Sequence, residues 1–266
     1  MKTILVFLKR DWAIYKSYKL QVVIQFLSLI FFLVIIFFLS KLIETGSNSY
    51  LDKYKGNYTS FLVVGILFQW FASASLNSFA KSIREEQKLG TLEFLLFCPK
   101  NLIELLIGSS IYKFLKLFVQ SAIMIFLVKY VFLIEMSSNL LPSLLIIILL
   151  IFSLSGIGFM SAGIILAFKQ GDPINWIFTT LSTFLSGVFF PVEMLPKGLR
   201  DISAVLPTTH ALDSLRKLLI LNSNLDSILS ELYILICFSV VSLLTGIFLL
   251  RLGFKYARIK GSLSSY

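Results

Sequence analysis

Long stretches without a charged residue are the feature that most limits what this chain can fold into. Five such runs occur, at residues 20–40, 56–80, 136–168, 173–192 and 232–250. A helix needs about 20 apolar residues to cross the ~30 Å hydrocarbon core of a bilayer. The chain is also 57% hydrophobic, more than a soluble domain of 266 residues can bury. The runs therefore predict five membrane-spanning helices.

A sixth span is expected at residues 105–134, although this apolar stretch contains Lys113 and Lys116. A lysine at the bilayer centre costs about 2.5–3.5 kcal/mol. A helix of this length reaches about 45 Å, so both ammonium groups can lie in water near one end of the span. We therefore expect an all-α polytopic membrane protein. Its six transmembrane helices are predicted at about 20–43, 57–80, 105–134, 141–168, 173–191 and 231–251.

The basic residues predict the orientation in the membrane. The first 19 residues carry five Lys or Arg against one acid, and the segment after residue 250 carries four and no acid. Lys and Arg accumulate on the cytoplasmic side. Both termini and residues 81–104 are therefore expected in the cytoplasm, in a plasma (inner) membrane protein. The net charge of +10 lies beside apolar runs, which favours lipid headgroups over nucleic acid. The first run is too long for a signal-peptide core and no A-x-A site follows it, so no cleavage is expected.

Residues 1–19 are predicted to form an amphipathic helix that lies in the membrane interface. At 3.6 residues per turn, one face is apolar and a neighbouring arc is basic. The alternative is a basic flank that only sets the orientation. The residues singled out for this helix are Leu5, Leu8, Lys9, Arg10, Trp12 and Tyr15.

Small residues are frequent in the fourth span. Gly158 and Ala162, like Gly163 and Ala167, lie four residues apart. This spacing allows close helix approach, so packing inside the bundle is expected. A lining of a transport path is the alternative.

The connection at residues 81–104 is expected to form a short helix presented to a soluble partner. Gly90 would break the preceding helix, Thr91 would cap the next one, and Glu93 would lie in its first turn. Pro99 would end it. Residues 92–97 include five large apolar side chains, which need lipid or a protein surface to cover them. A solvated turn is the alternative.

The outer connection at residues 191–220 contains Pro191, Pro196 and Pro207, with Gly187 just before it. This pattern is typical of a re-entrant segment, in which a helix enters the outer leaflet, breaks and returns. Such backbone needs protein or water around it. An external loop with two surface helices is the alternative.

These two connections carry a resemblance to a known family. Residues 186–220 resemble the signature of type-2 ABC transporter permeases, with a Gly and Pro closing the fifth span, a second Pro, and an LP-x-x-[HY]-x-x-D-x-x-R stretch. The matching residues are Gly187, Pro191, Pro196, Pro207, His210, Asp213 and Arg216. Residues 85–101 are similar to the family's cytoplasmic coupling segment. Its E-x-x-x-G-T-x-E-x-L-x-x-x-P pattern is present at Glu86, Gly90, Thr91, Glu93, Leu95 and Pro99.

The resemblance implies a permease that forms a homodimer or heterodimer and binds separate P-loop ATPase subunits. It would export a drug, a lipid or a glycolipid, with polysaccharide or haem export as alternatives within the family. The residues implied to contact the ATPase are Arg84, Glu85, Glu86, Gly90, Thr91, Glu93, Leu95 and Pro99.

The chain itself is not expected to be an enzyme or to hold a cofactor. No Gly is followed by Lys, so the sequence contains no Walker A loop, and ATP and Mg²⁺ would bind to the partner chain. One His and two Cys make a metal site improbable, and His210 is expected to cap rather than to catalyse. An ion-coupled secondary transporter and a membrane assembly protein remain as alternatives.

Overall fold

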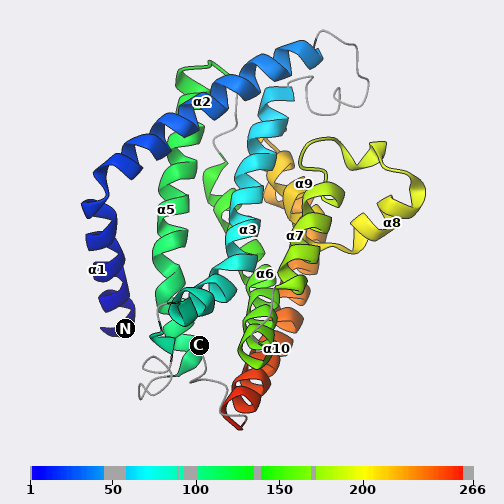
Figure 1. Ribbon diagram of the computed structural model, residues 1–266. Coiled ribbons are helices and arrows are strands. Elements are labelled where there is room, and N and C mark those ends of the chain that lie inside the picture. The colour runs from blue at the N-terminus through cyan, green and yellow to red at the C-terminus, as the bar shows by residue number, and fades with distance from the viewer. Residues whose placement is uncertain are drawn as a thin grey trace.

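The computed structural model describes residues 2–44, 58–88, 90–92, 101–134, 139–168 and 172–259, and these residues contain helices and no strand (Figure 1). This confirms the expected all-α fold. The α-helices are α1 (Lys2–Ser17), α2 (Lys19–Glu44), α3 (Tyr58–Lys88), α5 (Leu102–Tyr130), α6 (Leu140–Phe168), α7 (Pro173–Leu185), α8 (Lys197–Val205), α9 (Pro207–Leu219) and α10 (Leu229–Ile259). Two 3₁₀ turns, η2 (Val192–Met194) and η3 (Leu225–Ile228), precede α8 and α10.

Among the described residues, five helices are long and apolar enough to cross a membrane: α2, α3, α5, α6 and α10. Large apolar side chains on the outside of α2, α5 and α10 are exposed, including Phe31, Val119 and Leu244. An exposed apolar surface of this extent matches a lipid environment. The chain is therefore an integral membrane protein.

In the region of the predicted fifth span, the structure differs from the prediction. Instead of one helix over residues 173–191, the structure has the 13-residue helix α7, followed by a turn at 186–190. Thirteen residues extend about 20 Å, less than the ~30 Å hydrocarbon core. The Asp172 side chain caps the start of α7 by accepting a hydrogen bond from the Asn175 N–H (3.2 Å), and Gly187 follows its end with φ +79°. A charge-free run is thus not always a continuous helix.

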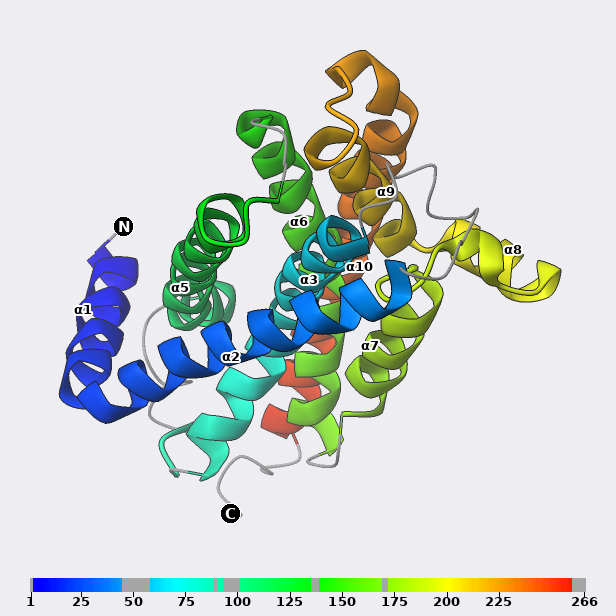
Figure 2. The same ribbon diagram turned by 90° about the horizontal axis from the view of Figure 1, so that it is seen from above.

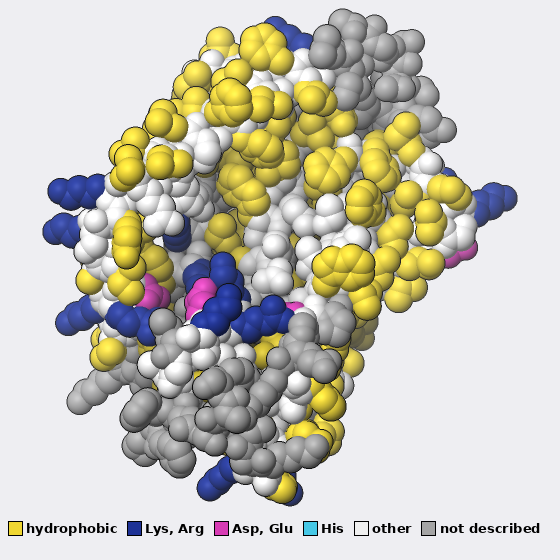
Figure 3. All heavy atoms as spheres, in the orientation of Figure 1, with side chains coloured by type: hydrophobic (Ala, Val, Ile, Leu, Met, Phe, Trp, Pro, Cys, Tyr) yellow, Lys and Arg dark blue, Asp and Glu magenta, His cyan; other side chains and the backbone are white. Residues whose placement is uncertain are grey.

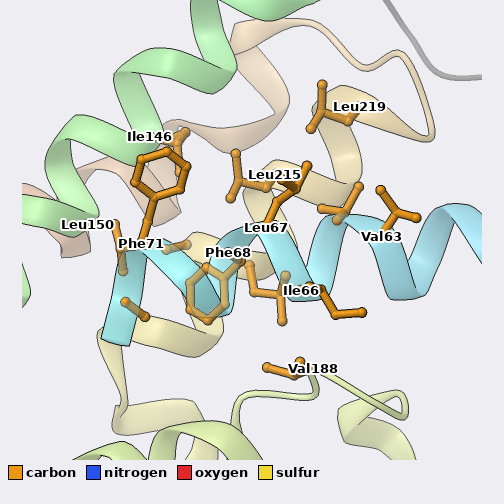
Figure 4. Close-up of a cluster of buried hydrophobic side chains, with 14 of the residues drawn as sticks. Val63, Ile66, Leu67, Phe68, Phe71, Ile146, Leu150, Val188, Leu215 and Leu219 are labelled. Carbon is orange, nitrogen blue, oxygen red and sulfur yellow. The ribbon is translucent and has the colours of Figure 1, made fainter. Parts of the chain in front are cut away.

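Helix α3 lies at the centre of the bundle, with α2, α5, α6, α7 and α9 around it (Figure 2). It is the most buried of the five long helices. Figure 4 shows its apolar side chains packing against residues of α6, of α9 and of the turn after α7. The labelled residues of this cluster are Val63, Ile66, Leu67, Phe68, Phe71, Ile146, Leu150, Val188, Leu215 and Leu219.

Helices α6 and α10 touch through their backbones. A Cβ atom at Gly246 would lie 2.2 Å from the carbonyl oxygen of Gly156, and one at Gly253 would lie 2.1 Å from that of Gly163. The closest contacts therefore involve two pairs of glycines that are seven residues apart on each helix, rather than residues four apart. Gly158 does pack inside the bundle as expected, because a Cβ there would lie 2.8 Å from a carbonyl oxygen of α3.

The glycine contacts predict a strong effect of a single methyl group. In Gly246→Ala the added methyl group meets backbone, which cannot rotate away, so we expect a loss of about 1–3 kcal/mol in stability. The measurement is the melting temperature of the detergent-solubilised protein. Gly198→Ala is the control, since a Cβ at Gly198 on α8 meets nothing within 4 Å. An unchanged melting temperature for Gly246→Ala would contradict the α6–α10 contact.

Candidate functional site

The expected coupling segment begins inside α3, because this helix continues to Lys88. Arg84, Glu85 and Glu86 therefore lie on its last turns rather than in a loop. Gly90 ends the helix with φ +68°. Its N–H donates to the Gln87 carbonyl (3.1 Å), and the Thr91 N–H donates to the Glu86 carbonyl (3.0 Å). This is the Schellman arrangement, which satisfies the last carbonyls of a helix. Glu93, Leu95 and Pro99 lie outside the described residues.

Thr91 bonds backward along the chain. Its hydroxyl donates to the Glu86 carboxylate, whereas the sequence analysis expects it to cap the following helix. The same carboxylate lies 3.9 Å from the Arg10 guanidinium of α1. Thr91 and Glu86 thus connect the end of α3 to the first helix.

A second ion pair connects α3 to α5. The Lys113 ammonium lies 3.8 Å from the Glu85 carboxylate and donates to the Ser82 hydroxyl at 3.3 Å. We call Arg10, Glu85, Glu86 and Lys113 the ionic junction, because together they join α1, α3 and α5. The junction gives Lys113, which lies in the middle of the largely apolar helix α5, a charged partner.

The apolar face of helix α1 is buried along one side and exposed along the other. Phe7 packs on Gly108 of α5, where a Cβ would lie 2.8 Å from the Phe7 ring. Leu8 and Tyr15 are half-buried on this side. Leu5 and Trp12 point outward and are 54% and 61% exposed. The basic residues Lys9 and Arg10 are also exposed.

Each proline of the outer segment precedes or begins a helix. Pro191 caps η2, Pro196 caps α8, and Pro207 is the first residue of α9. These are positions where a missing N–H leaves no hydrogen bond unmade. The prolines thus divide residues 191–220 into two short helices.

Two more motif residues fasten α9 to its neighbours. The His210 Nε2 atom lies 2.8 Å from the Ala204 carbonyl at the end of α8, in the capping role expected of it. The Lys217 ammonium lies 2.9 Å from Asp213 and 2.5 Å from Glu231 at the start of α10. Burial lowers the pKa of Lys217, but hydrogen bonds to these two carboxylates outweigh it and leave this pKa raised.

Arg216 is the most deeply placed charge of the motif, at 2% exposure. Its guanidinium carbon lies 3.4 Å from the centre of the Phe61 ring on α3, and its Nη2 donates to the Val188 carbonyl (3.2 Å). The Tyr58 hydroxyl donates to the Phe189 carbonyl (2.7 Å). Non-helical backbone in a bundle needs such donors. Arg216 and Tyr58 therefore hold the 186–190 turn against α3.

One face of α3 stays uncovered and carries polar residues. Asn77, Lys81, Arg84 and Lys88 follow each other at intervals of four, three and four residues, so they share this face. Two cavities flank it. One of about 1250 Å³ lies between α3, α6 and α7, and one of about 660 Å³ lies between α3, α2 and α5. Asn77 and Lys81 line both cavities. We call this feature the α3 groove.

Figure 3 shows the face that carries this groove. Lys, Arg and acidic side chains gather over the lower part of α3 and α5, below a strip that has few hydrophobic side chains. The α7 wall of the groove is polar as well, since Asn175 and Thr179 line the larger cavity. Higher up, the Gln69 amide donates to the Thr183 hydroxyl of α7 (2.7 Å).

Of the groove residues, only Arg84 is expected from the sequence to be functional, and there as a contact with the ATPase; Asn77, Lys81 and Lys88 are not recognised as site residues. The signal was present as polar residues at helical spacing, namely Ser73, Asn77, Lys81, Arg84 and Lys88. Within the described ranges, no group of three or more His, Cys, Asp or Glu side chains could hold a metal ion.

The structure is thus a bundle of apolar helices with a polar groove, a charged junction at one end and the two short helices α8 and α9. The model of the ABC-2 type transporter family matches residues 2–220. The chain belongs to this family.

Two relatives give a similar picture. The chain is 24% identical to the linearmycin resistance permease protein LnrN of Bacillus subtilis (strain 168) over 183 residues, which is 68% of this chain and 47% of LnrN. It is 22% identical to the probable multidrug ABC transporter permease YbhR of Escherichia coli (strain K12) over 189 residues, which is 67% of this chain and 50% of YbhR. The chain thus spans about half the length of the curated relatives it matches.

The Arg216 contacts predict that lysine cannot replace arginine there. Lysine keeps the charge but lacks the planar group that stacks on Phe61 while donating to Val188. We expect Arg216→Lys to cost about 2–3 kcal/mol and to speed hydrogen exchange of the 188–190 amides. Mass spectrometry of the exchanged protein measures this. Arg200→Lys is the control, because Arg200 also donates to a backbone carbonyl but is exposed. Equal exchange in both variants would contradict the role of Arg216.

Proposed function

We propose that this chain is the membrane permease subunit of an ATP-driven exporter. Membership of the ABC-2 type transporter family supports the class of transporter. A permease of this family normally works with a separate ATPase subunit. On this proposal ATP and Mg²⁺ bind to that partner and none of the residues of this chain is catalytic.

The α3 groove is the observation that carries the proposal. A helix buried on its other sides keeps one face of Ser, Asn, Lys and Arg side chains open to cavities. Polar side chains at membrane depth are costly unless they face water or a polar ligand. The groove is therefore the proposed half-pathway of this subunit. A second permease, identical or different, completes it.

The orientation of the proposed exporter follows from the basic residues. Both termini and the ionic junction face the cytoplasm, and α8 and α9 lie toward the outside of the plasma (inner) membrane. Cargo enters the groove near Lys81 and leaves past the 186–190 turn. The relatives' names, which mention linearmycin resistance and multidrug transport, favour drug-like or lipid-like cargo.

The Gly90 turn is the proposed contact with the ATPase. It ends α3 next to the ionic junction, so a subunit that pushes on this turn acts on α1, α3 and α5 together. Residues 93–99 continue the coupling segment beyond the described ranges.

Gly90→Ala tests this contact. Alanine fits the space, since nothing lies within 4 Å, but φ +68° is strained for any residue with a Cβ. We expect the α3 end to shift and the retention of a co-expressed P-loop ATPase to fall about fivefold, which corresponds to roughly 1 kcal/mol. Pull-down of the complex measures this. Gly198→Ala also has open space but an ordinary φ, and it should retain the ATPase normally.

A stronger form of this pull-down experiment uses a triple variant in which Gly90, Thr91 and Glu93 are all replaced. Normal ATPase binding by that triple variant would rule out the coupling assignment. Direction is tested in inside-out vesicles, where added ATP should drive accumulation of cargo. Transport driven by an ion gradient without any ATPase would overturn the exporter proposal.

A further inference from the structure

Three basic residues of the α3 groove lack an acidic partner. Lys81, Arg84 and Lys88 all line the larger cavity. In the part of the chain that the structure describes, no carboxylate lies within ion-pairing distance of any of them. At this end of the groove, basic side chains without a direct ion pair therefore line a cavity, and they outnumber the acidic side chains there by three to two.

The two acids that line the same cavity are already engaged. Glu85 pairs with Lys113 of α5. Asp172 accepts hydrogen bonds from the Ser161 hydroxyl and from the Asn175 backbone N–H and side-chain amide. Both acids thus have partners other than the three basic residues. With three basic and two acidic side chains, the lining of the cavity keeps a net positive charge, which attracts an anion.

Two residues that line this cavity each have a buried polar atom without a hydrogen-bond partner among the described residues. These atoms are the Nη2 of Arg84 and the Oδ1 of Asn175, whose residue is only 1% exposed. A buried guanidinium N–H is best satisfied by an anionic oxygen. The Asn175 oxygen can accept from a hydroxyl group beside that anion. The unmet groups together describe a hydroxylated acidic headgroup.

The cavity is large and also has an apolar part. Ile164, Phe168 and Trp176 line it, with Phe168 63% and Trp176 71% exposed. The cavity volume of about 1250 Å³ exceeds the ~300–1,000 Å³ of ordinary small-molecule pockets. An apolar chain attached to the headgroup can therefore lie against these side chains.

We infer that the basic end of the α3 groove binds the acidic headgroup of an amphiphile, with a phosphate or carboxylate on Arg84, Lys81 and Lys88 and the apolar tail along Phe168 and Trp176. The amphiphile is the cargo, so the inference rests on the proposed exporter function. Binding itself does not require ATP and can be measured separately.

The binding test uses the full chain in nanodiscs of zwitterionic phosphatidylcholine. Trp12→Phe and Trp70→Phe leave Trp176 as the single tryptophan. A 12-carbon phosphate that carries bromine on its tail should quench Trp176 at a concentration at least tenfold below that of a trimethylammonium probe with the same tail. Equal potency of the two probes would overturn the headgroup assignment.

Charge variants locate the site. Lys81→Gln combined with Arg84→Gln should raise the half-quenching concentration of the phosphate probe about tenfold, since each removes a charge-assisted contact. When Arg84→Lys replaces Arg84→Gln in this double variant, one positive charge returns, and part of the binding should be restored. Lys255→Gln is the matched control, because it removes an exposed charge from the same end of the bundle, on α10. If Lys255→Gln weakens binding as much as the pair, general surface charge explains the result and the site is refuted.

Two further measurements distinguish an amphiphilic cargo from free phosphate and from a bilayer lipid. Inorganic phosphate alone should not displace the probe, and displacement at comparable concentration would replace the amphiphile site with a simple anion site. The unlabelled 12-carbon phosphate should stimulate ATP hydrolysis by the permease–ATPase complex. A different result would refute cargo binding and show a site for a bilayer lipid. In that case phosphatidylglycerol protects Trp176 from quenching by the probe, and the 12-carbon phosphate does not stimulate ATP hydrolysis. ATP-driven export of another compound in that case would leave the proposed function standing.

Discussion

The backbone contact between α6 and α10 is the constraint on which the rest of the bundle depends. In lipid, helices are not driven together by the hydrophobic effect, so close packing and hydrogen bonds must do it. Glycine at 156, 163, 246 and 253 brings the two backbones together, and the Ser242 hydroxyl adds a bond to the Ser153 carbonyl (2.7 Å). Helix α3 packs against this pair at Gly158 of α6. The remaining helices then pack around α3, and one of its faces stays open.

The open face explains why α3 combines deep burial with a polar pattern. Its apolar residues meet α6, α9 and the turn after α7, whereas Asn77 and Lys81 meet cavities. The turn after α7 is non-helical and would leave carbonyl groups unpaired in lipid. The donors to these carbonyl groups are Arg216 of α9 and Tyr58 of α3. The outer segment is thus fixed to the same helix that forms the groove.

The sequence predicts the features that depend on local chemistry. Charge-free length identifies four of the five long spans, whereas Lys113 and Lys116 interrupt the apolar stretch of α5. Gly90 and the three prolines mark where helices end or begin. The helix that begins at Pro173 was predicted to continue to residue 191 instead of 185, because hydropathy is insensitive to the break at Gly187, whose positive φ is a property of the turn. The α6–α10 contact was missed because glycines seven residues apart mean little until the partner helix is known. Likewise, Asn175 and Asp172 became groove residues only when α7 packed beside α3.

Helix α3 connects the ionic junction at one end of the bundle to the outer turn at 186–190. Its last turns carry Glu85 and Glu86 of the ionic junction, and its first turns carry Tyr58, Phe61 and Gly65, which contact the outer turn and Arg216. Helix α3 is continuous from Tyr58 to Lys88, and Figure 1 shows that its last turns bend away from the direction of the rest of the helix. A continuous hydrogen-bonded helix transmits displacement better than a chain of loops. On the proposed function, a displacement of the Gly90 turn by the ATPase reaches the outer turn through α3 and moves the groove residues between these points at the same time.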